Sequence, residues 1–256
     1  MRIQAFIFNW PGEKQRAAKL EEMLRQNCEV SVINSDDSMR NLHPHWCHIG
    51  NDGYFTDQWN AALEQFNGDV LLHVQADVWP HDVGPMLAEC VRYMRDHDVG
   101  VYAPDIVYTS HVYRRESLAI LHNGVYEVPS TDCSCWAVTA EVLRNMPELD
   151  PEVNRIGWGI DFLVAAVAKR MGRKVVRDYR FRADHPKSRG YDRQEALKQW
   201  KEFKQGLDPV LRETMDALEL EHERVVLRST SDAPASPGIM QLRSRFVRAA
   251  HALWSK

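Results

Sequence analysis

The stretch Gly68-Asp-Val-Leu-Leu-His-Val-Gln-Ala-Asp77 decides the fold of this 256-residue chain. Its centre, Val70–Val74, is an apolar run interrupted only by His73, of the kind that forms a strand buried on both faces of a sheet. A Gly-Asp turn precedes the run, and polar residues follow it, ending at the carboxylate of Asp77. Ligands of open α/β sheets bind at the carboxyl ends of the strands. The polar residues just after each strand are therefore the candidates for function.

Strands and helices alternate around this run. Strands are predicted at Ile3–Asn9, Val30–Ile33, Val70–Val74 and Val99–Ala103, and helices at Glu13–Gln26, Phe55–Phe66 and Val83–Asp96. This alternation predicts an α/β fold with a mostly parallel central sheet covered by helices on both faces.

The pattern loosens after residue 104. An antiparallel pair is predicted at Val112–Leu121 and Gly124–Val128, further strands at Asp132–Val138 and Lys174–Tyr179, and helices at Asp161–Met171, Tyr191–Gly206 and Pro209–Glu223. The stretch 229–237 is rich in Ser, Ala and Pro, which indicates a linker. We therefore predict an α/β domain over 1–190, a helical extension over 191–228, and a linker with a basic amphipathic helix over 229–256.

Composition narrows the class of protein. Lys plus Arg number 32 and Asp plus Glu 36, a net charge of −4, which argues against a dedicated nucleic-acid binder. Apolar residues make up 44%, as expected of a folded chain. The five cysteines have no regular spacing, there is no signal-peptide pattern, and no run of about 18 apolar residues occurs. A cytoplasmic protein is expected.

Three residues occupy positions at which a catalytic or metal-binding side chain is expected. Asp77 at a strand end is placed to hold a cation, although it could also cap a turn before Trp79. Asp161 opens a helix, where carboxylates complement the dipole, but the preceding Gly157-Trp-Gly159 suggests a mobile loop presenting an exposed tryptophan to a sugar ring. His185 follows a predicted strand, and it becomes a metal ligand only if the fold brings it near Asp77.

These residues resemble, in order and spacing, glycosyltransferase family 2 and its relatives with the GT-A fold. The resemblance runs over about residues 1–186 and rests on Asn51-Asp-Gly53, Asn60, Gly68-Asp-Val70, Gln75-Ala-Asp77, Gly157-Trp-Gly-Ile-Asp161 and His185. It implies a GT-A domain over 1–190 that moves a sugar from a nucleotide-sugar, above all a UDP-sugar, to an acceptor hydroxyl with inversion. Two positions depart from the family pattern: Gln75 replaces the first acid of Asp-x-Asp, and Ile160 replaces the acid that often precedes the base.

The resemblance also implies residue roles. Asp161 is expected to be the catalytic base, and Asp77 and His185 the ligands of Mn²⁺ or Mg²⁺. The residues expected to contact the nucleotide are Asn9, Asn34, Asp36, Asn51, Asn60 and Gln75. Those expected on the acceptor side are Asp132, Trp158 and Gly159, with Asp132 equally open to a buried or turn-capping role. The expected acceptor is a glycan or glycolipid, in polysaccharide or glycolipid assembly.

Other readings of the sequence stay open. Gln75 and Ile160 also fit a catalytically silent nucleotide-sugar-binding or scaffold protein of the same fold. A nucleotidyltransferase is disfavoured because 9–13 is not a Gly-rich basic loop. The dense cluster His43-Pro-His-Trp-Cys-His48, with Cys133 and Cys135, permits a structural zinc only as a minor alternative to free thiols. The basic helix predicted over 239–256 could lie on the inner membrane surface, or pack on the domain or on a second copy in a homodimer.

Overall fold

The computed structural model describes residues 1–186 and 191–227. The strands are β1 Ile3–Asn9, β2 Glu29–Asn34, β3 Cys47–His48, β4 Val70–Gln75, β5 Trp79–Pro80, β6 Val99–Ile106, β7 Ala119–His122, β8 Val125–Glu127, β9 Cys135–Thr139 and β10 Lys174–Asp184. The α-helices are α1 Lys14–Arg25, α2 Phe55–Gln65, α3 Val83–Asp96, α4 Ala140–Arg144, α5 Ile160–Arg170, α6 Arg193–Gly206 and α7 Pro209–Val225. Short 3₁₀ helices cover Asp37–Met39 and Arg115–Ser117.

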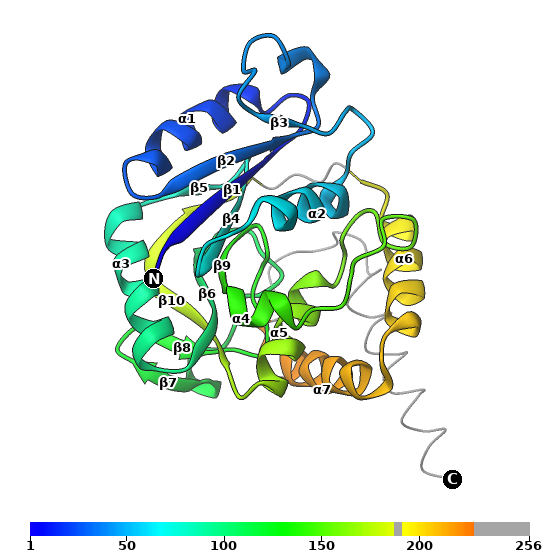
Figure 1. Cartoon of the computed structure of the whole chain (residues 1–256). Helices are drawn as coiled ribbons and strands as arrows, with labels where there is room; N and C mark the ends of the chain where they lie inside the picture. Colours follow the sequence, from blue (N-terminus) through cyan, green and yellow to red (C-terminus); the bar gives the residue numbers. More distant parts are fainter. Residues whose placement is uncertain (187–190, 228–256) are drawn as a thin grey trace.

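One ten-stranded sheet runs through the molecule in the order β3-β2-β1-β4-β9-β6-β10-β8-β7, with β5 added to β10 (Figure 1). β1, β2, β3, β4, β6, β7 and β10 all run in one direction. β9 lies antiparallel between β4 and β6. The sheet is therefore mostly parallel, and the carboxyl ends of β1, β2 and β4 meet at one edge, as the sequence predicts.

Helices cover both faces of the sheet and bury two apolar cores. α1 and α3 pack on one face, and α2, α4 and α5 on the other, where α6 and α7 add a further layer (Figure 1). The alternation within β1 shows how one strand serves both cores, because Ala5 and Ile7 point to the first and Phe6 and Phe8 to the second. Trp200 and Met215 carry α6 and α7 into the same core as α5.

Most predicted elements form, with shifts where local signals are weak. The segment predicted as a strand from Val112 becomes strand only at Ala119–His122 (β7), because Arg115–Ser117 takes a 3₁₀ turn and Tyr113 instead bridges Val226. β10 runs on to Asp184, five residues beyond the predicted end, through an irregularity in its pairing with β6. α4 and the two-residue strands β3 and β5 were not predicted.

The remaining predictions concern the cysteines, membrane crossing and the C-terminal segment. Cys133 and Cys135 are free thiols, as predicted, and Cys135 is buried on β9. Within the part of the chain described, no helix combines the length and apolarity that crossing a bilayer requires. The linker and basic helix predicted over 229–256 lie outside the described residues, so the membrane and homodimer contacts expected of them stay predictions. The predicted domain boundary at residue 190 also stays a prediction.

Candidate active site

Asn9 and Asn34 join the carboxyl ends of β1 and β2. Asn9 Nδ2 donates to Asn34 Oδ1 at 2.6 Å, and both side chains are buried. Asn34 Nδ2 donates in turn to Asp36 O and to His48 Nδ1, each at 2.8 Å, so its donors are used within the protein. Asn9 Oδ1 is buried and has no hydrogen-bond partner among the described residues. Of these two predicted nucleotide contacts, Asn9 keeps an atom for a ligand, whereas Asn34 orients the strand ends.

Two loops are tied together beyond these strands. Asp36 Oδ1 accepts from Ser38 N at 3.0 Å and from Ser38 Oγ at 2.6 Å, capping the short helix at Asp37–Met39. Asn51 Oδ1 accepts from Asp37 N at 2.8 Å. Because β3 pairs with β2 in parallel, the loops that follow these strands lie at the same sheet edge. The loops that carry Asp36 and Asn51 therefore meet beyond the carboxyl ends of β2 and β3, and nucleotide contact by these two residues stays a prediction.

Asp77 and His185 meet just past the end of β4. His185 Nε2 lies 3.6 Å from Asp77 Oδ2, and the two side chains are 17% and 11% exposed. Asp77 Oδ1 and His185 Nδ1 are both buried without a hydrogen-bond partner in the described chain. Burial raises the pKa of the Asp77 carboxyl, an effect that His185 opposes and Glu13 strengthens. Buried polar atoms without partners are costly unless a ligand completes them.

This pair fits a divalent cation. Carboxylate oxygen and imidazole nitrogen are both ligands of Mn²⁺, and carboxylate oxygen is the ligand that Mg²⁺ prefers. Two protein ligands leave most of the coordination sphere for water and phosphate oxygens, as in nucleotide sites. The fold thus meets the condition set by the sequence, which was that His185 must approach Asp77.

Hydrogen bonds lead from β4 to Asp132. Gln75 N donates to Ser134 O at 2.8 Å, and Ser134 N donates to Asp132 Oδ1 at 2.9 Å. The Thr109 hydroxyl donates to Asp132 Oδ2 at 2.6 Å. Burial acts to raise the pKa of Asp132, but the nearby His111 and these hydrogen bonds outweigh it and lower that pKa. Asp132 is therefore a buried, hydrogen-bonded carboxylate that caps a turn, one of the two predicted roles, whereas its place on the acceptor side stays a prediction.

Asp161 lies in the first turn of α5, next to a buried histidine. Its Oδ2 is 3.1 Å from His111 Nε2, and its Oδ1 accepts from Phe162 N at 3.0 Å. The Asp161 side chain is 17% exposed and that of His111 is 4% exposed. A carboxylate that is mostly enclosed, yet open on one side, is suitable for taking a proton from a bound hydroxyl.

The Gly157-Trp-Gly159 loop is packed, which corrects the expectation of a mobile loop with an exposed tryptophan. Both glycines are buried at positive φ, +76° and +84°. A Cβ on Gly159 would lie 1.0 Å from Trp200, and one on Gly157 would lie 2.3 Å from Phe55. Trp158 is half-buried and meets Tyr191 edge to face at 5.8 Å. The glycines are required for close packing of this loop between α2 and α6, and they fix the start of α5.

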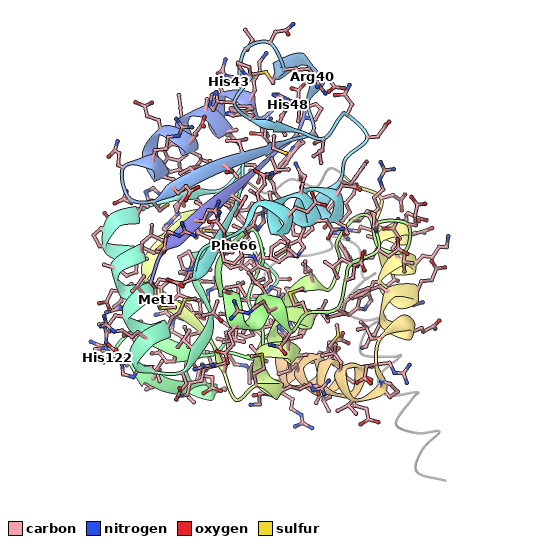
Figure 2. All side chains as sticks on the ribbon, in the orientation of Figure 1. Met1, Arg40, His43, His48, Phe66 and His122 are labelled. Carbon is pink, nitrogen blue, oxygen red and sulfur yellow. The ribbon has the colours of Figure 1, made fainter. Side chains whose placement is uncertain are left out.

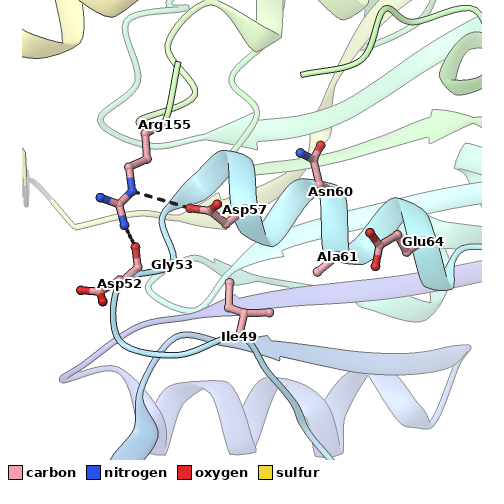
Figure 3. Close-up of a pocket in the computed structure, with 8 residues that line it drawn as sticks. All are labelled: Ile49, Asp52, Gly53, Asp57, Asn60, Ala61, Glu64 and Arg155. Atoms are coloured by element: carbon pink, nitrogen blue, oxygen red, sulfur yellow. Dashed lines mark hydrogen bonds and ion pairs between the residues drawn. The ribbon is translucent and has the colours of Figure 1, made fainter. Parts of the chain in front are cut away.

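Asn60 is placed differently from the other predicted nucleotide contacts. Its Nδ2 donates to Leu149 O at 2.9 Å, a bond that fastens the segment after α4 to α2. It also lines a cavity of about 350 Å³ beside α2, together with Asp57 and Glu64 (Figure 3). Arg155 ion-pairs with Asp57 at 3.7 Å at the rim of this cavity. The amide nitrogen of Asn60 is thus used within the protein, and a nucleotide contact at this position stays a prediction.

The histidine cluster meets α1. His43 and His45 come together with Glu21 so that their ligand atoms lie within 4.8 Å of one another (Figure 2 labels His43). Glu21 Oε1 accepts from His45 at 2.9 Å and from Arg25 at 2.7 Å, while Oε2 accepts from Trp46 Nε1 at 2.9 Å. The His43 ring stacks on Trp46 at 4.0 Å. Hydrogen bonds and stacking account for this cluster without a metal ion.

Sequence reasoning missed the residues beneath Asp161. His111, Tyr113 and His222 form a buried polar group there, and His222 comes from α7, more than 60 residues beyond Asp161. A lone histidine in the loop after β6 and another on an amphipathic helix carry no motif. Only their alternation with apolar neighbours, which indicates inward-facing positions, could have marked them.

No family model matches the chain, and no curated protein sequence matches it. Solved structures do. GalNAc-T7, crystallised with UDP, GalNAc and Mn²⁺, superposes with a TM-score of 0.59 at 12% identity, covering 98% of this chain and 55% of that one. S. aureus TarS 1–349 with UDP-GlcNAc gives 0.57 at 14% identity, covering 88% of this chain and 73% of that one. The same protein with UDP gives 0.60 at 12% identity, covering 96% and 78%.

The likeness is one of architecture. The chain spans about half the length of the GalNAc-T7 chain that it matches. Identities of 12–14% do not carry chemistry from those proteins to this one, whereas the TM-scores together with the sheet order carry the fold. The chain therefore has the GT-A fold, the fold of the nucleotide-sugar glycosyltransferases to which it is similar.

Proposed function

We propose that this chain is a divalent-metal-dependent glycosyltransferase that moves a sugar from a UDP-sugar to an acceptor hydroxyl, with inversion at the anomeric carbon. The observation that carries the proposal is the Asp77–His185 pair at the end of β4, in which each side chain has one buried atom that meets no hydrogen-bond partner among the described residues. Support also comes from the solved structures, because the GalNAc-T7 crystal contains UDP and Mn²⁺ and the TarS crystals contain UDP or UDP-GlcNAc.

Asp77 and His185 would hold the cation, Mn²⁺ or Mg²⁺. When bound, the ion supplies positive charge to the leaving diphosphate. Gln75, the last residue of β4, lies two residues before Asp77. Its neutral amide is better suited to a ribose or phosphate contact than to service as a second charged metal ligand. Asn9 Oδ1, Asp36 and Asn51 would contact the nucleotide at the neighbouring strand ends.

Asp161 would act as the general base. It takes the proton from the acceptor hydroxyl, the acceptor oxygen bonds to C1 of the sugar, and the bond from C1 to the diphosphate oxygen breaks. The electron pair of that bond leaves with the diphosphate, so atoms and charge balance. Asp132 and Trp158, with the backbone of Gly159, would form the acceptor side. The acceptor proposed is a glycan or glycolipid hydroxyl, and the proposed location is the cytoplasm.

Calorimetric titration with UDP, GDP and dTDP, each with and without Mn²⁺, tests donor binding. We expect UDP to bind and Mn²⁺ to strengthen its binding. Asp77→Asn should remove the Mn²⁺ dependence, whereas Asp96→Asn, an exposed carboxylate at the end of α3, should not. UDP binding that is indifferent to Mn²⁺ in the wild type would contradict the metal site.

Turnover distinguishes the enzyme from a silent binding protein, the alternative that Gln75 and Ile160 favour. UDP release from UDP-GlcNAc and UDP-GalNAc with Mn²⁺ measures both transfer and slow hydrolysis. Asp161→Asn should leave UDP affinity nearly intact and lower turnover by about 10²–10⁴-fold, the usual contribution of a general base. Tight UDP binding with no turnover under any condition would instead establish the binding protein.

A further inference from the structure

His111 is a buried histidine held on several sides. Its backbone oxygen accepts from the guanidinium of Arg177, a side chain 1% exposed that also donates to Asp105 Oδ1 at 2.8 Å. The backbone N of His111 donates to Thr109 Oγ1 at 3.1 Å. Its ring lies 5.9 Å from the ring of Phe162, the residue after Asp161. The main chain and the ring are thus both fixed.

A second layer supports the ring from α7. The rings of His111 and His222 lie 4.9 Å apart at 71°. His222 Nδ1 is 2.9 Å from the hydroxyl of Tyr113, which donates to Ser130 O at 2.6 Å. Because that hydroxyl has given its only proton to Ser130, it accepts from His222. This layer packs against the His111 ring from α7.

The imidazole of His111 faces two carboxylates. Nε2 lies 3.1 Å from Asp161 Oδ2, and the ring approaches Asp132 through Thr109, whose Oγ1 is 3.4 Å from His111 Nδ1. Yet His111 Nε2 is buried and makes no well-directed hydrogen bond within the described residues. Catalytic hydrogen bonds are often poorly aligned in the absence of substrate and tighten when it binds. Nε2 therefore has one acceptor within reach, the carboxylate of Asp161.

We propose that His111 is a positioning residue for Asp161, whose Nε2–H holds Asp161 Oδ2 and thereby turns the carboxylate toward the acceptor hydroxyl. This inference rests on the proposed function, since it assigns His111 a task in the same reaction. The hydrogen bond fixes the plane of the Asp161 carboxylate while the proton moves from the acceptor hydroxyl to it. An unheld carboxylate at the start of α5 rotates, and a displacement of about 1 Å at a reacting group can cost about 10²-fold in rate.

Two substitutions separate positioning from packing. His111→Gln keeps an N–H near the position of Nε2 but loses the ring, whereas His111→Phe keeps a ring and loses the donor. We expect His111→Phe to lower kcat for UDP release by about 10²-fold, with the KM for UDP-GlcNAc nearly unchanged, and His111→Gln to recover most of that loss. His122→Gln, at the exposed far edge of the sheet (Figure 2), is the control and should behave as wild type.

The order of the two variants decides the inference. If His111→Phe is the more active, the residue serves packing only, and the inference is overturned while the proposed function stands. If the wild type itself shows no turnover, the proposed function fails, and nuclear magnetic resonance then tests the contact alone. The Nε2–H signal of His111, assigned by its absence in His111→Gln, should move in Asp161→Asn and stay in Asp96→Asn. An identical signal in the wild type, Asp161→Asn and Asp96→Asn would overturn the contact.

Discussion

The floor of the site contains a histidine whose burial should make the stability of the protein depend on pH. His73 lies inside β4 and is fully buried, with its ring 4.1 Å from that of Phe8 and Nδ1–H donating to Cys133 O at 2.6 Å. Burial lowers the pKa of His73 from 6.5 to about 3, and the Cys133 carbonyl opposes this only in part. The native protein therefore keeps the ring neutral where the unfolded chain protonates it.

The size of the effect follows from this difference. Between the two pKa values, the unfolded state binds one more proton than the native state, so the free energy of unfolding rises with pH by up to about 1.4 kcal/mol per pH unit. Going down from about pH 6 to about pH 4.5, His73 alone should remove about 2 kcal/mol of stability. Well above pH 6.5 the ring is neutral in both states, and His73 contributes no pH dependence.

Urea unfolding followed by tryptophan fluorescence at these two pH values measures the loss. In His73→Phe, stability at pH 6 should be lower than in the wild type, because Cys133 O loses its donor, and the fall from pH 6 to pH 4.5 should be smaller than in the wild type by about 2 kcal/mol. His122→Gln, which changes an exposed histidine, should leave the fall as it is. An equal fall in His73→Phe and the wild type would refute the reasoning, since His73 would then titrate alike in both states.

Two further predictions test the supports of the site. Gly159→Ala should lower the free energy of unfolding by about 1–3 kcal/mol more than Gly172→Ala does. Both variants replace a glycine at positive φ, but only at Gly159 would the new Cβ meet Trp200. Equal losses in thermal unfolding would mean that the Trp200 ring moves aside freely. Glu21→Ala should lower the free energy of unfolding by about 1–3 kcal/mol, because the buried Trp46 Nε1–H loses its acceptor. Any rise in melting temperature that Zn²⁺ produces should be the same in Glu21→Ala as in the wild type, and a smaller rise in the variant would restore the metal reading of this cluster.

The roles of several site residues depend on contacts that only the tertiary structure shows. Asn34 and Asn60 look equivalent to other polar residues near strand ends, yet each side chain bonds to the protein itself. Trp158 was expected to be exposed because glycines flank it. Those glycines instead allow Phe55 and Trp200 to pack against the loop. Local composition describes what a backbone can do, whereas the neighbours that use this freedom come from distant helices.

The sequence by itself determined the sheet edge and its polar residues. The short run Val70–Val74, bounded by Gly68 and by polar residues, favours a buried strand, and Asp77 then follows its carboxyl end, because side-chain pattern and chain direction are local properties. The order of motifs likewise predicted the GT-A fold, which the solved structures bear out. These features depend on residues close together in the chain.

Only the tertiary structure decided which side chains meet. It brought His185 to Asp77 across 108 positions and packed His111 and His222 beneath Asp161. Such contacts depend on how β10 lies beside β6, how β9 enters between β4 and β6, and how α7 packs on α5. The free energy that fixes these arrangements is spread over the two apolar cores, so no short segment encodes the pairing. The candidate ligands were therefore readable in sequence, while the residue that holds the candidate base was not.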